Sequence, residues 1–276
     1  MSISYDSQAI LADFTKRHGI TYPLLSDVGS ATIKRYGILN TVVEEALGPN
    51  GKDPALRADI QTYETVGEPA ERHRGIPFPG TFIVDRQGRV TSRFFEDAYW
   101  ERNTVSNIMA RVGTARTPVQ VMQASTAHLD AKAYVTDGNI ALGSKFSVVV
   151  DITPKRGMHV YAPGAAGYRV VSLRIDPQQY VRIQPRPYPR SEIYHFVPLN
   201  ERVPVYQRPF TLGADVVAEA TAEARKALTG RNELVLTGAL EYQACDDKIC
   251  YNPASIPLAW KVALQPLVPA APQPPR

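Results

Sequence analysis

Both cysteines of the 276-residue chain lie in the run Tyr242-Gln243-Ala244-Cys245-Asp246-Asp247-Lys248-Ile249-Cys250-Tyr251-Asn252-Pro253. Residues 233–242 before this run and 256–264 after it read as β-strands. If these strands pair as a hairpin, the loop brings the two cysteines within the distance that a disulfide requires. The run is therefore the one place where the sequence offers redox chemistry.

A ring this short is a weak structural staple. Closing six residues stabilises the fold by about 2 kcal/mol, against about 4 kcal/mol or more for a ring of a hundred residues. A domain of ordinary size has little need of such a bridge, so we favour a reversible redox pair over a stabilising bridge, which stays the alternative. Two cysteines supply half a zinc site and none of the five histidines clusters near them in sequence, so no metal is expected.

The charges around the pair do not decide which cysteine attacks. Asp246 and Asp247 disfavour a thiolate at Cys245, whereas Lys248 favours one at Cys250. No helix begins there to lower the pKa of either thiol, so we expect a slow, selective thiol that reacts when a partner docks. The aromatic residues that bracket the loop either shield the sulfurs or pack in the core, and they are Tyr242 and Tyr251.

Apolar residues in the second half of the chain recur at a period of two. We expect strands at 119–124, 131–135, 146–152, 170–175, 181–184, 210–217, 233–242 and 256–264. Strands at that spacing, bounded by Gly, Pro, Asn or Asp, indicate a β-sandwich. A helical turn is predicted only within 218–228, and the tail at 266–276, rich in Pro and Ala, is expected to be disordered.

The first half reads as alternating strands and helices. Ser7 is expected to cap a helix over 8–17 that ends at Gly19. The other predicted elements are a strand at 3–5, helices at 30–36 and 101–112, a strand near 60–65 in an irregular insertion, and a hairpin of strands 81–84 and 89–95. A short linker then separates two predicted domains, 1–113 and 118–265.

Composition narrows the function classes. Hydrophobic residues make up 44% and charged residues 21% of the chain, as in a soluble globular protein. The net charge of +4 is spread without a basic block that interleaves aromatics, which argues against nucleic-acid binding. No apolar run is long enough for a membrane span, and the start has no signal-peptide pattern. No phosphate loop or other cofactor motif stands out, so no cofactor is expected.

Two segments of the second half resemble a known family. The cysteine run and Gly157-Met158-His159-Val160-Tyr161 are similar to the N-terminal periplasmic domain of the DsbD thiol:disulfide interchange proteins, over about residues 118–265. The resemblance implies an all-β immunoglobulin-like sandwich that carries electrons from a membrane thiol reductase to thioredoxin-like partners in the periplasm. It places Tyr161 beside the disulfide, His159 at a position usually aromatic, a cap loop within 196–199, and Cys250 as the cysteine bonded to partners.

The first half resembles the peroxiredoxin (AhpC/TSA) branch of the α/β thioredoxin-like fold. The matching motifs are Ile3-Ser4-Tyr5-Asp6, Tyr22-Pro23-Leu24-Leu25-Ser26-Asp27, Arg35-Tyr36-Gly37-Ile38 and Pro79-Gly80-Thr81-Phe82-Ile83-Val84-Asp85-Arg86-Gln87-Gly88. By this resemblance Pro79 takes the cis-proline position that faces a partner's disulfide. The family's peroxidatic cysteine precedes the segment where this chain begins, and no residue before Cys245 is a cysteine. We therefore expect a thioredoxin-like domain that lacks its cysteine-bearing first unit, and no peroxidase activity from the chain as given.

Three hypotheses of function follow. The preferred one is thiol-disulfide exchange with thioredoxin-like partners through Cys245 and Cys250, supported by Tyr161, His159, Tyr242, Tyr251 and Pro79. A non-catalytic immunoglobulin-like binding module with a structural disulfide is the second. A thiol peroxidase is the third, and it requires a cysteine-bearing segment upstream of this chain. A thioredoxin-like sheet without its first strand-helix unit would have an unpaired edge. Either the chain starts late, which would also remove a signal peptide, or this unit was lost and the second domain covers the edge.

Overall fold

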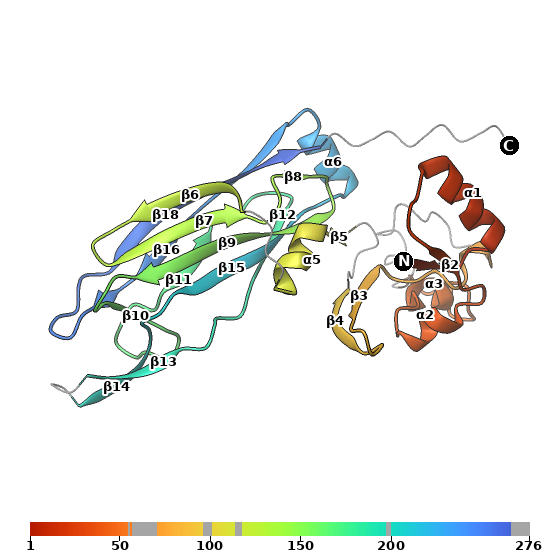
Figure 1. Ribbon diagram of the computed structural model, residues 1–276. Helices are drawn as coiled ribbons and strands as arrows, with labels where there is room; N and C mark the ends of the chain where they lie inside the picture. Colours follow the sequence, from red (N-terminus) through yellow and green to blue (C-terminus); the bar gives the residue numbers. More distant parts are fainter. Residues whose placement is uncertain (55, 57–70, 96–100, 114–117, 197–199, 266–276) are drawn as a thin grey trace. The chain divides into compact units, whose positions relative to one another are not determined.

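A computed structural model describes residues 1–54, 56, 71–95, 101–113, 118–196 and 200–265 of the chain (Figure 1). The chain divides into two compact units, Met1–Glu101 and Arg102–Arg276. No helix within the described residues has the length and apolar character that crossing a bilayer requires. The strand expected near 60–65, the linker at 114–117 and the tail at 266–276 lie outside the described residues.

The first unit is an α/β region that begins with a strand, a helix and a parallel strand. β1 (Ser2–Ser4) pairs with β2 (Leu24–Ser26), and α1 (Gln8–His18) connects them. The Ser7 side chain accepts a hydrogen bond from the N–H of Ile10, and Gly19 ends the helix at φ 60°. Both caps confirm the prediction, because an N-terminal hydroxyl and a left-handed glycine satisfy the groups that helix ends leave unpaired.

The predicted hairpin is present in the first unit as a separate sheet. β3 (Gly80–Val84) pairs with β4 (Val90–Phe95), and Gly88 adopts φ 79° in the turn between them. The remaining helices are α2 (Ala31–Arg35), α3 (Thr41–Ala46) and the 3-10 turn η1 (Glu71–His73). A cavity of about 290 Å³ lies between β1 and β3 and is lined by Ile3, Ile33 and Phe82 among others. Within the described residues, β1 pairs only with β2 and β3 only with β4.

The cis peptide bond implied before Pro79 is wrong, since the described residues contain no cis peptide bond. The segment that leads to Pro79 is extended beside the chain after α2. Pro77 bridges to Leu39, and the N–H of Phe78 donates to the carbonyl of Ile38 at 2.6 Å. The trans form of an X-Pro bond is favoured over the cis form by about 0.5–1 kcal/mol. The two contacts with residues 38 and 39 hold the segment before Pro79 extended, and the peptide bond at Pro79 is trans.

The second unit contains two sheets that face each other across one core. One sheet consists of β12 (Val181–Pro185), β15 (Phe210–Ala218), β9 (Ser144–Pro154), β7 (Leu129–Val135) and β6 (Val119–Ser125), with β5 (Arg102–Asn103) paired to β9. The other consists of β11 (Ser172–Ile175), β16 (Glu233–Tyr242), β18 (Ala254–Leu264) and β8 (Asn139–Ile140). All eight strands predicted for this half are present.

Alternation along the strands builds that core. Every second residue of β18 from Ile256 to Leu264 is buried, and β7 buries every second residue from Leu129 to Val135. Leu236 on β16 lies opposite Trp260 on β18, and both side chains are essentially inaccessible to solvent. The two apolar faces therefore pack together as the period of two predicted, and the helix α6 (Ala222–Leu228) is the predicted helical turn.

A third sheet lies at one end of the sandwich (Figure 1). Its strands are β13 (Glu192–Phe196), β14 (Glu201–Tyr206), β10 (His159–Tyr161) and β17 (Ala244–Cys245). β13 and β14 were not predicted from the sequence. Of the cap loop expected within 196–199, Phe196 ends β13, and 197–199 lie outside the described residues. β17 brings the first cysteine into this sheet.

The segment that enters the second unit is bound to β9. β5 pairs with Ser144 and Lys145, and α5 (Val105–Arg111) follows it. The side chain of Asn107 on α5 accepts a hydrogen bond from the Ser147 hydroxyl at 2.6 Å. The predicted first domain, 1–113, includes α5, whereas the contacts of this helix are with β9 of the second unit.

Candidate functional site

The cysteine loop connects β16 to β18 and is closed by a disulfide. Cys245 and Cys250 are bonded, their α-carbons lie 4.2 Å apart, and the two residues form an isolated antiparallel bridge. The N–H of Tyr251 donates to the carbonyl of Ala244 at 2.9 Å and closes the base of the loop. The prediction that paired flanking strands bring the sulfurs together is confirmed.

Asp246 shapes the loop between the cysteines. One carboxylate oxygen accepts the N–H groups of Lys248 at 2.7 Å and Ile249 at 2.8 Å, and the other accepts the hydroxyl of Tyr251 at 2.8 Å. The bonds from Ile249 and Lys248, followed by that from Tyr251, lower the pKa of Asp246 below its usual value. The carboxylate is thus used to hold the turn in place.

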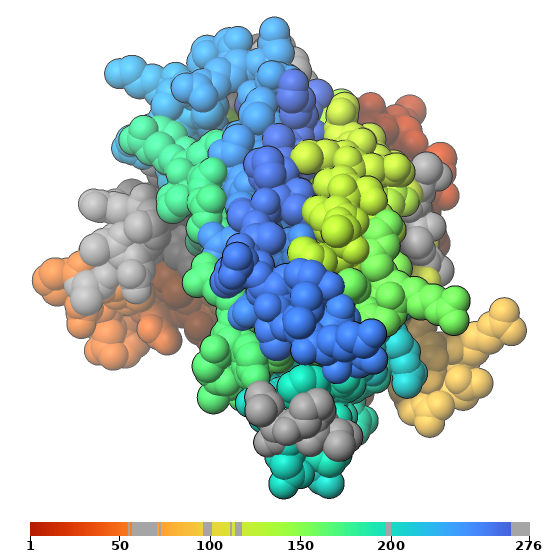
Figure 2. Space-filling model, turned by 90° about the vertical axis from the view of Figure 1, so that its left-hand side faces the viewer, coloured from red at the N-terminus to blue at the C-terminus, as the bar shows by residue number. Residues whose placement is uncertain are grey.

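The two cysteines differ in access to solvent. Cys245 is 1% exposed and packs in a small cluster with Tyr161, Val203 and Val205, whereas Cys250 is exposed. The hollow over the disulfide has a volume of about 10 Å³, which is about the room for one water molecule. A partner therefore meets this site at the surface and reaches Cys250 first. Figure 2 views this end of the sandwich, with the cysteine loop (blue) next to β13 and β14 (teal).

The structure brings Tyr161 to both sulfurs. Its hydroxyl lies 2.9 Å from the sulfur of Cys245 and 3.2 Å from that of Cys250. Disulfide sulfurs carry no hydrogen, so the hydroxyl is the donor, and its single hydrogen is directed to one sulfur or shared between the two. Burial, and after it the neighbouring Tyr168 and the charge of Glu201, raise the pKa of Tyr161 far above its usual value, so the hydroxyl keeps its proton.

His159 lies next to the cysteine in the third sheet. β10 pairs with β17 through His159 and Cys245, and the imidazole packs on Tyr194 with ring centroids 4.4 Å apart. The side chain is 3% exposed, and burial lowers the pKa of His159, partly opposed by the charge of Asp246. The ring is consequently neutral at neutral pH and acts as an aromatic surface beside the disulfide.

The two tyrosines that flank the loop do not line the hollow over the sulfurs. Tyr242 is buried in the main core, and its hydroxyl donates to Thr126 at 3.1 Å. Tyr251 packs on the ring of His128 at 4.4 Å and donates to Asp246. Pro79, the remaining candidate, belongs to the first unit.

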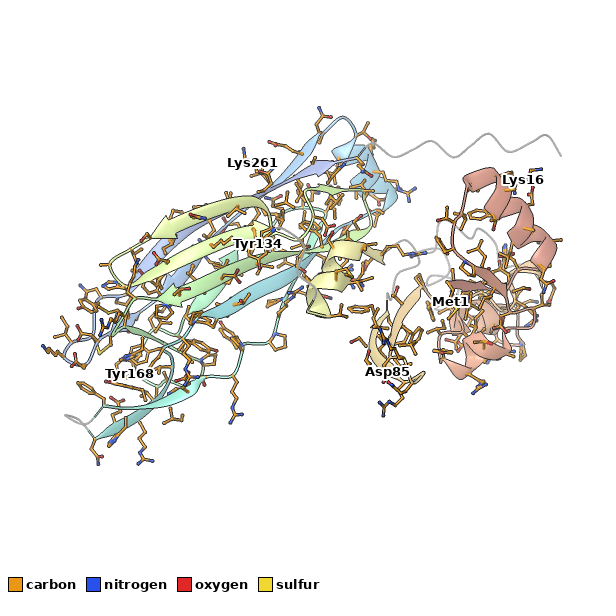
Figure 3. All side chains as sticks on the ribbon, in the orientation of Figure 1. Met1, Lys16, Asp85, Tyr134, Tyr168 and Lys261 are labelled. Atoms are coloured by element: carbon orange, nitrogen blue, oxygen red, sulfur yellow. A yellow bond between two sulfur atoms is a disulfide. The ribbon has the colours of Figure 1, made fainter. Side chains whose placement is uncertain are left out.

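Several residues of the site were missed from sequence. The missed residues Tyr168, Tyr194 and Glu201 line the hollow together with His159, Tyr161 and the two cysteines. Phe196, which belongs to the expected cap loop, lines it as well. Figure 3 shows Tyr168 at the end of the sandwich that carries β10, β13 and β14. Tyr194 lies on β13 and Glu201 on β14, and these strands have no clear alternation of polar and apolar residues. Tyr168 lies in a loop, so no local pattern marks it.

No group of three or more His, Cys, Asp or Glu residues is placed to hold a metal ion within the part of the chain that the structure describes. The polar groups around the sulfurs instead hydrogen-bond to the loop and to one another. The chemistry available at this site is that of the disulfide and of the tyrosine hydroxyl beside it.

We expect the second unit to lose stability between pH 7.5 and pH 5, and we expect His159→Phe to make this loss smaller. The pKa of His159 is lower in the folded protein than in the unfolded chain, so the unfolded chain takes up the proton first. The free energy of unfolding therefore decreases as the pH drops below about 6.5. Each unit of pKa difference is worth about 1.4 kcal/mol. Urea unfolding of the two proteins at pH 7.5 and pH 5 measures this, and an equal loss in both would contradict the buried neutral imidazole.

Comparisons with known proteins match the two halves separately. Residues 1–93 match the model of the AhpC/TSA family, and residues 129–256 match that of the N-terminal domain of thiol:disulfide interchange protein DsbD. Both resemblances found in the sequence are thereby confirmed. A similar solved structure is the N-terminal periplasmic domain of ScsB from Proteus mirabilis, at 9% identity and a TM-score of 0.35. The alignment covers 52% of this chain and 51% of that one, so the chain spans about half the length of that relative. No curated protein matches this sequence.

Proposed function

We propose that this chain exchanges thiols and disulfides with other proteins through Cys245 and Cys250. The observation that carries the proposal is a disulfide between one buried and one exposed cysteine, with the hydroxyl of Tyr161 against both sulfurs. The match of residues 129–256 to the DsbD N-terminal domain supports the same activity. The site residues are then Cys245 and Cys250, with Tyr161 and His159 beside them.

The exchange proceeds in two steps. In the reduced protein, the thiolate of Cys250 attacks a partner's disulfide, forms a mixed disulfide, and releases one partner sulfur as a thiolate. The thiolate of Cys245 then attacks the sulfur of Cys250, which re-forms the internal disulfide and releases the partner's second thiolate. Two electrons pass from this chain to the partner, and the same steps in reverse reduce the chain again.

Tyr161 helps in both steps. Whenever a sulfur becomes a thiolate, the Tyr161 hydroxyl lies within hydrogen-bond distance and donates to it, which lowers the pKa of that thiol. A thiol of lower pKa supplies more of the attacking thiolate in these two steps, and it is the better leaving group when the steps run in reverse. Lys248 adds a positive charge to the exposed loop near Cys250, and Asp246 holds the turn that brings the two sulfurs together.

The partners in this proposal are thioredoxin-like proteins and a membrane thiol reductase, and the compartment is the periplasm. In the finer fold, the sandwich at 118–265 is immunoglobulin-like and residues 1–113 form a thioredoxin-like domain. The match of residues 1–93 to the AhpC/TSA family supports a docking or structural role for that domain, in which Pro79 faces a partner. These residues contain no cysteine, so the domain supplies no thiol of its own.

The reduction potential of the bridge separates an electron carrier from a structural staple. We expect a potential above about −300 mV, because bridges below that value resist reduction by glutathione. The measurement equilibrates the protein with dithiothreitol and glutathione buffers of known potential and quantifies alkylated thiols by mass. A bridge that stays oxidised at −300 mV would reject the carrier and leave the stabilising disulfide of an immunoglobulin-like binding module.

A further inference from the structure

Three side chains, each in contact with the next, connect β14 to the disulfide. The carboxylate of Glu201 accepts a hydrogen bond from the hydroxyl of Tyr168 at 2.6 Å. The ring of Tyr168 is stacked on the ring of Tyr161, with centroids 4.0 Å apart and planes 12° apart. Tyr161 in turn contacts both sulfurs.

We propose that Tyr168, anchored by Glu201, is a positioning residue that holds the Tyr161 hydroxyl against the sulfurs and so increases the reactivity of Cys250. The inference rests on the proposed function, because it concerns the same cysteine pair. Tyr168 itself is not among the residues that contact the sulfurs. Its effect is exerted through Tyr161.

The contacts of Tyr161 with the sulfurs do not by themselves fix its position, because sulfur accepts a hydrogen bond from a hydroxyl only weakly. The sulfur of a disulfide is a weak acceptor, so its contacts with the hydroxyl fix the direction of the O–H bond poorly. The flat stack on Tyr168 restricts the tilt of the Tyr161 ring, and His159 meets the same ring edge-on at 5.7 Å. Offset-stacked and edge-on contacts are the arrangements that aromatic pairs prefer. The position of the hydroxyl therefore depends on the rings around it.

Tyr168 is held in place although it lies in a loop. Its bond to Glu201 is assisted by charge, and such bonds are short and about twice as strong as neutral ones. The next residue, Arg169, donates its backbone N–H to the side chain of Gln243 at 2.9 Å, and Gln243 donates to the carbonyl of Tyr251 at 3.0 Å. The loop of Tyr168 is thus attached both to β14 and to the cysteine hairpin.

The hydrogen bond and the charge of Glu201 have opposite effects on a thiolate. The bond supports Tyr161 and thereby favours the thiolate, whereas the negative charge of the carboxylate disfavours it. Glu201→Gln keeps an acceptor for Tyr168 and removes the charge. Tyr168→Phe removes the anchor and keeps the stacked ring. The two substitutions consequently separate positioning from charge.

The test follows the alkylation of Cys250 by iodoacetamide against pH in the full-length reduced protein, with the modified cysteine identified by mass spectrometry. We expect Tyr161→Phe to raise the apparent pKa of Cys250 by about one unit. Tyr168→Phe is expected to shift it in the same direction, with alkylation at pH 7 slowed about threefold to tenfold. Tyr188→Phe makes the same chemical change outside the hollow and serves as the matched control.

The double variant decides between positioning and an independent effect. If Tyr168 acts through Tyr161, Tyr168→Phe produces no further shift once Tyr161 is phenylalanine. The proposal is overturned by a wild-type profile for Tyr168→Phe or by full additivity in the double variant. If Tyr168→Phe proves poorly folded, Glu201→Ala takes its place, because it removes the acceptor for Tyr168 as well as the charge. An apparent pKa of Cys250 no higher in Glu201→Ala than in Glu201→Gln would then overturn the proposal.

The failure of this inference is distinguishable from the failure of the proposed function. Alkylation by a small reagent requires no protein partner, so the pH profiles test Tyr168 even if no exchange with other proteins occurs. Conversely, a protein that exchanges disulfides at the same rate with and without the Tyr168 hydroxyl keeps the proposed function and rejects the positioning role.

Discussion

Replacing Cys250 by serine is expected to abolish disulfide exchange, whereas replacing Cys245 by serine is expected to trap the partner. Cys250 is the exposed residue of the pair, so it makes the first bond to a partner, and its loss lowers the exchange rate by more than about a hundredfold. Cys245 is 1% exposed and lies directly behind it. Without Cys245 the mixed disulfide forms and has no internal thiolate to resolve it.

A thioredoxin that keeps a single active-site cysteine, supplied as its mixed disulfide with thionitrobenzoate, is a suitable probe for this asymmetry. Thionitrobenzoate is the leaving group, and the probe has no second thiolate that could reverse the exchange. The reduced Cys245→Ser protein is mixed with it, and a covalent species that disappears on adding dithiothreitol is expected on a non-reducing gel. The double serine variant is the control for non-covalent association. Trapping by Cys250→Ser in place of Cys245→Ser would reverse the assigned roles, and the absence of trapping in both single variants would contradict the exchange proposal.

Truncating Leu236 to alanine is expected to cost the second unit about 3–5 kcal/mol of unfolding free energy. The side chain is fully buried on β16, opposite Trp260 on β18, where the two sheets meet. The loss includes the transfer free energy of the removed atoms and the cavity left between the sheets. Since domains are stable by only about 5–15 kcal/mol, this change removes a large part of the total.

Urea unfolding followed by circular dichroism measures this loss. Val121→Ala on β6 is the matched control, because that side chain is 42% exposed and its truncation should change stability by no more than about 0.5 kcal/mol. Equal effects of the two substitutions would contradict the face-to-face packing of the sheets. The comparison also bears on the site, because the cysteine loop connects β16 and β18 and depends on their pairing.

Local patterns predicted those parts of the fold that depend on neighbours in sequence. The period of two along β7 and β18 marks the face that each strand buries, and Ser7 and Gly19 mark the ends of α1. The disulfide was predictable for the same reason, since its two cysteines are separated by a short loop between two paired strands. One wrong expectation, a cis bond at Pro79, came from a resemblance and not from a local pattern. The helix predicted over 101–112 starts only at Val105, because residues 102 and 103 pair with β9.

Only the tertiary structure decided the environment of the disulfide. Glu201, Tyr168 and Tyr194 line the hollow over the disulfide from segments about 45 to 80 residues away along the chain, and two of them lie on strands that show no clear alternation. Whether a cysteine is exposed depends on which strands cover it, and β10 and β14 cover Cys245 while leaving Cys250 open. The sequence by itself determined that a dithiol closes a hairpin; the pairing of distant strands determined which sulfur faces a partner and which hydroxyl lies beside it.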